Sequence, residues 1–361
     1  CLSDWSSDVC SSDLTLRRLP DRITPPVLAH DRTRHRAGRA RPAHRMTGPV
    51  VDPRLPARLA DDLFGGRHSN PHALLGAHRL SERTVAFRVL RPQADGVTVV
   101  LGGNDGTPTS EHPMAEQAPG LWVVAVAIPS AATIPDYRYR VRYPADRAHN
   151  RADRAQESVD RAFTVADPYR FGPSIGDDEL ALVTAGQHRR LWEVLGAHVR
   201  TRDTPSGPVT GVAFSVWAPQ ARGVTVIGDF EGWEGRLAPM RKLPNSGVWE
   251  VFLPEVRAGE LYKYRVHGAD GTVVDKADPM ARATETPPAT ASVIVDDGQY
   301  PWGDAAWLRH RGRAAALSEP MSIYEVHLAS WRPGLGYREL AVELADYVTA
   351  MGFTHVELLP V

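Results

Sequence analysis

The sequence predicts a multidomain fold, in which two all-β modules precede the start of a parallel α/β sheet. Two observations support this prediction. A long motif returns later in the chain at constant spacing, which indicates a duplicated module. Residues 321–361 read as strand, helix and strand with short connections, which is typical of a parallel βαβ unit.

Composition limits the classes of function. The 361 residues are 42% hydrophobic, which is enough for two or three packed domains. A formal net charge of -1 gives no electrostatic reason to bind nucleic acid or an acidic membrane. No apolar run is long enough to span a membrane and no secretory signal is evident, so we expect a cytoplasmic protein. Cys1 and Cys10 are the only cysteines, and both precede the folded part, where we expect no disulfide and no thiolate metal site.

The first residues carry no folding pattern. Ser-Asp recurs at Ser3-Asp4, Ser7-Asp8 and Ser12-Asp13, and residues 16–45 are rich in arginine and proline without apolar periodicity. A basic nucleic-acid-binding arm and a transit peptide are alternatives, but we favour an artefactual or disordered leader over residues 1–46. We expect the authentic start at or near Met46.

The duplication is visible without any alignment gap. Residues 85–99 match residues 212–226 with an offset of 127 positions, as between Phe87 and Phe214, and Gly120-Leu121-Trp122 falls on Gly247-Val248-Trp249 at the same offset. Each copy is a series of short alternating strands separated by Gly and Pro, which predicts a β-sandwich of immunoglobulin-like type. We therefore assign residues 47–172 and 201–300 to the two modules. Apolar residues at helical spacing within 177–195 predict a helical linker, 173–200, between them.

The final segment, 301–361, combines a linker with the βαβ unit. Ser322–Leu328 and Phe353–Leu359 are rich in β-branched and aromatic residues, which predicts strands. Between them, Tyr337–Met351 has apolar residues at helical spacing, and Gly352 stands where a left-handed C-cap is expected.

Two strings in this segment carry a family resemblance. Tyr324-Glu325-Val326-His327-Leu328-Ala329-Ser330-Trp331 and Gly352-Phe353-Thr354-His355-Val356-Glu357-Leu358-Leu359-Pro360-Val361 resemble the first two barrel strands of the bacterial 1,4-α-glucan (glycogen) branching enzymes, members of the α-amylase superfamily. The resemblance implies the first βαβ unit of a truncated (β/α)₈ barrel. It also implies that the nucleophilic aspartate, the acid/base glutamate and the supporting aspartate come from later strands. We therefore nominate no catalytic residue, and interpret Glu325 and His327 as polar filling of a barrel layer.

The second copy resembles a glycogen-binding type of carbohydrate-binding module. Its Gly228-Asp229-Phe230-Glu231-Gly232-Trp233 is similar to a Gly-Asp-Phe-Asn-x-Trp loop, with Glu231 in place of Asn. The resemblance implies that Trp233 and Lys263 contact sugar, since an exposed indole offers a flat apolar face to a glucose ring. The alternatives are that Trp233 packs against the sandwich or a barrel, and that Lys263 is a solvated surface residue. Trp217 and Trp249 lie in strand patterns and are predicted to be core residues.

The first copy departs from this loop pattern. It has Leu101–Gly106 where the tryptophan loop should be and Arg138 in place of the lysine, so we expect weak sugar binding or none. His68, His72 and His78 could form a metal site on paper. Pro71 prevents the first two from sharing a helical face, and turn or capping roles are favoured.

The resemblance implies an enzyme that cleaves α-1,4 glucan and transfers the chain to a 6-hydroxyl, forming α-1,6 branches without cofactor or metal. Its partner would be α-glucan such as glycogen, with no nucleic acid or membrane, and we expect a monomer. As printed, the sequence is predicted to lack the catalytic residues. A non-catalytic glucan-binding protein is the alternative of a different class, and a debranching enzyme or trehalohydrolase is the nearer one.

Overall fold

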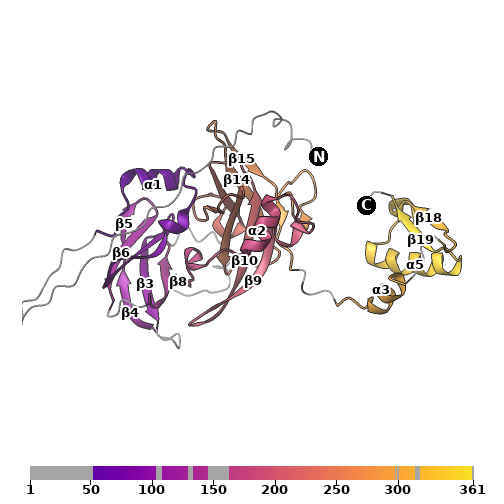
Figure 1. The fold of residues 1–361 in the computed structure, drawn as a ribbon, viewed down its shortest axis with the longest axis horizontal. Helices are drawn as coiled ribbons and strands as arrows, with labels where there is room; N and C mark the ends of the chain where they lie inside the picture. The colour runs from indigo at the N-terminus through magenta and orange to yellow at the C-terminus, as the bar shows by residue number, and fades with distance from the viewer. Residues whose placement is uncertain are drawn as a thin grey trace, which may run out of the picture. The chain divides into compact units, whose positions relative to one another are not determined.

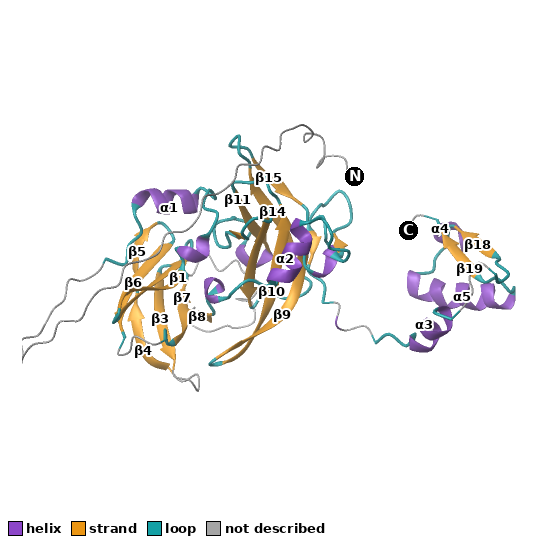
Figure 2. Ribbon diagram, in the orientation of Figure 1, coloured by secondary structure: helices purple, strands orange, loops and turns teal. Residues whose placement is uncertain are grey.

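The computed structural model describes residues 52–102, 108–128, 133–144, 162–296, 298, 301–313 and 318–359. The expected leader and most of the Leu101–Gly106 segment lie outside these ranges. Within them, no helix combines the length and the apolar character that crossing a membrane would require. The described part is a multidomain structure rich in β-sandwich architecture (Figure 1, Figure 2).

The first module consists of two antiparallel sheets preceded by the helix α1 (Ala57–Phe64) and the 3-10 turn η2 (Pro71–Ala73). The first sheet has the order β1-β2-β6-β5 and the second the order β4-β3-β7-β8. Their bounds are β1 Gly76–Ser81, β2 Thr84–Leu90, β3 Gly96–Gly102, β4 Pro108–Pro113, β5 Ala115–Ala118, β6 Leu121–Ala127, β7 Asp136–Arg142 and β8 Ala162–Val165. Phe87 and Val126 of the first sheet share one buried core with Val99 and Tyr139 of the second. The alternation of apolar side chains in each strand faces this core.

The second module repeats this plan. One sheet has the order β12-β13-β10-β9; in the other, β11-β14-β17-β16, the strand β15 also pairs with β14. Their bounds are β9 Gly196–Thr204, β10 Gly207–Trp217, β11 Gly223–Gly228, β12 Arg241–Lys242, β13 Val248–Pro254, β14 Leu261–His267, β15 Val273–Lys276, β16 Ala283–Thr284 and β17 Ser292–Val293. Phe214 and Trp249 of the first sheet pack with Val226 and Tyr262 of the second.

The duplication extends to individual side-chain contacts. Tyr137 donates to Asp167 Oδ2 over 2.6 Å in the first module, and Tyr262 donates to Asp278 Oδ2 over 2.5 Å in the second. Two buried indoles also match: the Nε1–H of Trp122 donates to Arg91 O at 3.3 Å, and that of Trp249 donates to Ala218 O at 2.9 Å. The two copies therefore share a fold and the polar bonds inside it.

The connection between the modules is less helical than its periodicity predicts. It contains η4 (Pro168–Arg170), α2 (Asp177–Thr184) and η5 (Leu191–Glu193) in place of one helix over 177–195. Gly186 has φ +66°, and a residue in the left-handed region ends an α-helix. Apolar spacing beyond that glycine reflects burial just after η5, where Val194 and Leu195 join a small core.

The C-terminal unit contains α3 (Ala305–Arg311), β18 (Ile323–Val326), α4 (Leu328–Trp331), α5 (Tyr337–Ala350) and β19 (His355–Leu358). β18 and β19 pair in parallel, and Val326 packs against Leu344 and Val348 of α5, as the βαβ pattern predicts. Gly352 has φ +77° beyond the end of α5, as expected of a left-handed cap. The first strand is shorter than predicted because the chain turns into α4 at Leu328.

Candidate functional site

The tryptophan loop of the second module is a tight turn that follows β11. The 3-10 turn η6 (Asp229–Glu231) leads into Gly232 and Trp233, with φ of +69° and +65°. A left-handed backbone costs a non-glycine residue about 1–2 kcal/mol, so surrounding contacts must hold Trp233 in place. Asp229 supplies them: its Oδ1 accepts from Trp233 Nε1 at 3.1 Å, and its Oδ2 accepts from Leu261 N at 3.0 Å. The half-buried indole is thus fixed by its N–H edge.

Glu231, which departs from the family pattern, has a defined role in the loop. Its carboxylate is buried, with both oxygens accepting from Gly235 N at 2.9 Å. Burial raises the pKa of Glu231 to about 7, against the opposing effect of backbone hydrogen bonds from Gly235, Leu237 and Gly228. The side chain therefore closes the loop behind Trp233.

Lys263 lies on the same face of the sheet as this loop. It pairs across the strands with Ile227, and a Cβ built on Gly235 would stand 3.0 Å from Ile227 Cγ2. Paired residues of antiparallel strands project to one side, so the loop folds over the residue opposite the lysine. Lys263 is half-buried, and its Nζ donates to Thr290 Oγ1 at 2.7 Å. Lys263 is therefore not a purely solvated surface residue, because its ammonium group has a hydrogen-bond partner within the module.

Arg265 is a member of the site that the sequence interpretation missed. Its Nη1 donates to Glu234 O at 2.8 Å, and its Nε and Nη2 bind the two oxygens of Asp275 at 2.8 and 3.0 Å. The guanidinium thereby ties the tryptophan loop to β14 and β15. The signal was present, because the alternation in Tyr262-Lys263-Tyr264-Arg265 places both basic side chains on one face.

This arrangement suits a neutral, polyhydroxylated ligand. Trp233 offers an apolar ring, while Lys263 and Thr290 offer hydrogen-bonding groups that suit hydroxyls. The carboxylates of Asp229 and Asp275 already accept bonds from Trp233 and Arg265, so they hold the loop in shape. Such a surface binds by stacking and hydrogen bonds.

The two other tryptophans of the second module differ in burial. Trp249 is fully buried, as predicted. The prediction for Trp217 was wrong, since its side chain is 50% exposed. In β10, Val212, Phe214 and Val216 point into the core, so Trp217 projects from the other face.

The first module places Arg138 on β7, opposite Val100, at the position that corresponds to Lys263. The structure describes only Leu101 and Gly102 of the predicted Leu101–Gly106 replacement for the tryptophan loop.

The three histidines have separate local environments. His68 Nδ1 accepts from Asn70 N at 3.2 Å, and His78 Nε2 contacts Leu75 O at 2.8 Å, which are the turn roles expected of them. The His72 ring lies edge-on to Tyr169, with 5.0 Å between centroids. Burial, together with the nearby charge of Arg241, lowers the pKa of His72 to about 3.

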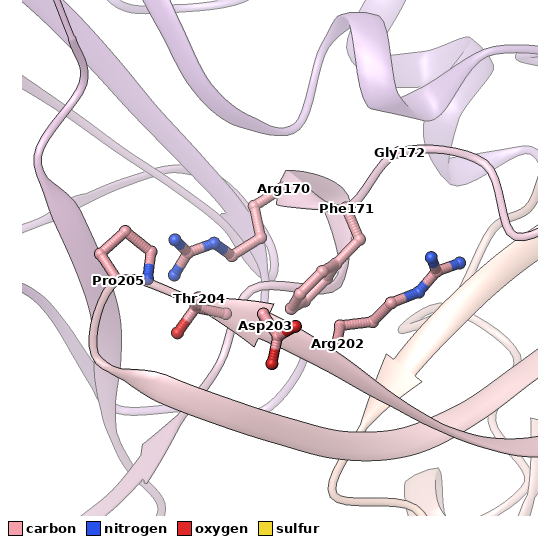
Figure 3. Close-up of a pocket in the computed structure, with 7 residues that line it drawn as sticks. All are labelled: Arg170, Phe171, Gly172, Arg202, Asp203, Thr204 and Pro205. Carbon is pink, nitrogen blue, oxygen red and sulfur yellow. The ribbon is translucent and has the colours of Figure 1, made fainter.

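A separate hollow of about 360 Å³ lies where the connection between the modules meets the end of β9 (Figure 3). Arg170 and Phe171 lie on one side of it, and Arg202, Asp203 and Thr204 on the other. Arg170 is paired with Asp136, whose pKa is lowered by hydrogen bonds from Ser206 and Arg170 although burial opposes that change. This hollow shares no residue with the Trp233 loop.

The predicted polar pair, Glu325 and His327, lies in β18 and at the N-cap of α4. Glu325 is paired with Glu357 of β19, and His327 Nδ1 lies 2.7 Å from Ser330 Oγ at the start of α4. These contacts belong to the strand pair and its turn.

Two protein-family models match separate parts of the chain. Residues 57–154 match the family model described as the N-terminal domain of the α-1,4-glucan branching enzyme GlgB. Residues 194–281 match carbohydrate-binding module 48, the isoamylase N-terminal domain. The Trp233 loop and Lys263 fall inside the second range.

Three curated proteins, each named 1,4-α-glucan branching enzyme GlgB, are similar over most of the chain. The protein from Nocardia farcinica (strain IFM 10152) is 51% identical over 327 residues, covering 89% of this chain and 41% of that protein. The one from Rhodococcus jostii (strain RHA1) is 52% identical over 301 residues, covering 83% and 38%. The one from Mycobacterium tuberculosis (strain ATCC 25618 / H37Rv) is 48% identical over 319 residues, covering 88% and 40%.

The chain thus spans about 40% of the length of the curated relatives that it matches. Both family models, and identity near 50%, point to the same group of proteins. The resemblance predicted from the sequence is confirmed: over most of its length, the chain is similar to the amino-terminal part of the bacterial 1,4-α-glucan branching enzymes.

Proposed function

We propose that this chain is the amino-terminal part of a 1,4-α-glucan branching enzyme and that its second module binds α-glucan. The Trp233 loop carries the proposal, because it holds an anchored indole and lies on the sheet face that also carries Lys263, within a matched carbohydrate-binding module. Trp233 stacks on a glucose ring, and Lys263 donates to its hydroxyls. Asp229, Glu231 and Arg265 hold the loop in the required shape.

The finer architecture belongs to the same proposal. The modules at 47–172 and 201–300 are immunoglobulin-like sandwiches, joined by a linker at 173–200. Residues 301–361 lead into a (β/α)₈ barrel whose first βαβ unit is β18-α5-β19. The shared core between two antiparallel sheets supports the sandwich assignment, and the parallel pairing of β18 with β19 supports the barrel assignment.

In the proposed enzyme, a carboxylate attacks the anomeric carbon of an α-1,4 linkage while a second carboxyl group protonates the leaving oxygen. The glucosyl-enzyme intermediate then passes its chain to a 6-hydroxyl of the acceptor. Such retaining chemistry needs two carboxyl groups about 5 Å apart. The residues described here offer a binding surface for that reaction, and we assign its carboxylates to later barrel strands. We place the protein in the cytoplasm as a monomer, without nucleic acid or membrane partners.

Co-sedimentation of the chain with insoluble α-glucan tests the binding function. We expect the parent to pellet with the polymer, and Trp233→Ala to pellet with at least fivefold lower apparent affinity, since about 1 kcal/mol or more of stacking is removed. Trp307→Ala, which removes an exposed indole from α3, is the control and should pellet like the parent. Equal pelleting of the parent and Trp233→Ala would remove the loop assignment.

A second assay separates the enzyme from the alternative of a non-catalytic glucan-binding protein. Residues 1–361 alone should leave the iodine-complex spectrum of amylose unchanged, because branching needs the carboxylate pair. A spectral shift produced by this polypeptide would contradict that expectation. Branching by a longer polypeptide that continues the barrel after Val361 would favour the enzyme over the binding protein.

A further inference from the structure

Trp217 is an exposed indole that the Trp233 loop does not use. Half of its side chain is exposed, although it stands at the end of the long central strand β10. Its Nε1–H donates to Ser246 O at 3.2 Å, and a Cβ on Gly247 would come within 3.1 Å of the same nitrogen. The ring is therefore fixed by its edge, and Gly247 leaves room for it.

The residues that hold this indole also line a hollow of about 380 Å³. Its wall combines two prolines with neutral polar groups and one lysine, from the residues Ser69, Pro219, Lys242, Leu243, Pro244, Asn245, Ser246 and Gly247. Lys242 turns toward the protein, where its Nζ donates to Pro219 O at 2.8 Å and stands 5.6 Å from the ring centre of Trp249. None of the described residues that line the hollow carries a carboxylate. This chemistry suits a neutral polyol better than a cation.

The duplicated module provides an internal comparison. At the offset of 127 positions, Trp217 corresponds to Leu90, which is buried with Ala60 and Leu63 of α1. The hollow residues Asn245 and Ser246 correspond to Ala118 and Pro119. The first copy thus has a leucine buried against α1 where the second has an exposed indole, and Ala118 and Pro119 where the second has polar groups. The fold itself therefore does not require an aromatic residue or an open hollow here.

We infer that Trp217 and the adjoining hollow form a second α-glucan contact, built on the second module with Ser69 contributed by the first. The indole takes the C–H face of one glucose unit, and Asn245 and Ser69 bind its hydroxyls. Trp217 lies on the outer face of the β12-β13-β10-β9 sheet, whereas the Trp233 loop covers the outer face of the β11-β14 sheet, so the two contacts can hold two chains of one branched glucan. Two linked contacts on one polymer raise its apparent affinity. The inference rests on the proposed glucan-binding function of this module.

Electrophoresis of the full chain through gels containing glycogen tests this contact, with Trp217→Ala, Trp233→Ala, the double variant and Trp307→Ala run together. We expect each single variant of the pair to raise the apparent dissociation constant about tenfold. The double variant should migrate as it does without glycogen, and Trp307→Ala should match the parent. Trp307 suits this control because its indole is 55% exposed, close to the 50% of Trp217.

A titration with maltoheptaose, followed by NMR of the indole N–H signals, supplies a direct readout. The spectrum of Trp217→Phe identifies the indole N–H signal of Trp217, because that signal is missing from it. In Trp233→Ala, this signal should shift when the sugar is added.

If Trp217→Ala binds glycogen like the parent, and the Trp217 signal does not shift in Trp233→Ala, the second contact is refuted while the Trp233 function stands. If Trp233→Ala binds glycogen like the parent while Trp217→Ala binds more weakly, the Trp233 assignment fails and the Trp217 contact stands. A parent that does not bind glycogen refutes both, and a dimer abolished by Trp217→Ala would assign the surface to self-association.

Discussion

The hydroxyl of Tyr262 donates a 2.5 Å hydrogen bond to Oδ2 of Asp278 inside the second module. Asp278 is itself buried, and burial raises its pKa although the tyrosine bonds oppose that change. Its other oxygen accepts from Met280 N at 2.8 Å, so the carboxylate joins a core strand to the chain beyond β15. The tyrosine and the aspartate therefore depend on one another for burial.

We expect Tyr262→Phe to destabilise the second module by about 1–3 kcal/mol, because it leaves a buried acceptor without its strongest donor. Tyr264→Phe is the matched control, since Tyr264 reaches the same oxygen at 3.4 Å, and it should cost less than about 1 kcal/mol. Calorimetry of both variants measures the difference. An equal loss of unfolding free energy in both variants would mean that the shorter hydrogen bond stabilises the module no more than the longer one.

Glu231 should make the stability of the second module depend on pH. The pKa of Glu231 is about 7 in the folded module, whereas the ordinary value is 4.5. Between pH 4.5 and 7, the folded form therefore keeps a proton that the unfolded chain has lost. Stability is then greatest below pH 4.5 and falls as the pH rises toward 7, by about 3 kcal/mol at most.

Glu231→Gln should remove this fall, since the amide oxygen still accepts from Gly235 N and carries no charge. The test is the difference in unfolding free energy between parent and variant from pH 4.5 to 8. Asp278 and His72 contribute equally to the pH dependence of both proteins, so their contributions drop out of this difference. Glu234→Gln, in the same loop, is the control and should track the parent. A constant difference between parent and Glu231→Gln over this range would contradict the assignment.

Gly235→Ala should disturb the tryptophan loop. Gly235 has φ +78°, and an added Cβ would lie 2.4 Å from Arg265 Nη1 and 3.0 Å from Ile227 Cγ2. Gly259→Ala separates the cost of backbone strain from the cost of steric overlap. Gly259 also has a positive φ, +92°, but nothing lies within 4 Å of the built Cβ. We expect about 1 kcal/mol for Gly259→Ala from backbone strain alone, and about 3 kcal/mol for Gly235→Ala.

Glycogen affinity gives a further check on the same pair. Gly235→Ala should weaken binding at temperatures where the module remains folded, whereas Gly259→Ala should not. Equal binding by both variants would show that the shape of the loop does not matter for the sugar.

Lys263→Ala should weaken maltoheptaose binding about threefold to tenfold, since one hydrogen bond to a neutral ligand is lost. Arg138→Ala removes the side chain at the matched position of the first module, and should leave the affinity unchanged. Isothermal titration measures both variants. A weaker complex with Arg138→Ala alone would transfer the binding site to the first module.

Much of the strand pattern could be predicted because it depends on local alternation. Val212, Phe214 and Val216 alternate toward the core as expected, and they lie within the repeat visible in the sequence. The exposure of Trp217 could not be predicted, since alternation tells which face a residue occupies and not what covers that face. The helix predicted over 177–195 is too long because Val194 and Leu195, just after η5, are apolar for packing in a core that includes Val248 of β13.

Within the candidate site, Trp233 and Lys263 came from the family resemblance, and the structure places them on one face of the β11–β14 sheet. The bonds of Asp229 and Arg265 join segments far apart in the chain, so local patterns carry little information about them. Glu231 was singled out as a departure from the motif, but its burial depends on the closure of the whole loop.

Leu90 and Trp217 stand at equivalent positions of a duplicated scaffold, yet only Leu90 is enclosed by its neighbours. Natural selection for folding alone would therefore constrain the first position and leave the second free to drift. A library of random substitutions sorted only for correct folding should lose most alternatives at position 90 and keep nearly all of them at position 217. The same scaffold position thus serves as an enclosed core site in one copy and as a surface that a ligand can reach in the other.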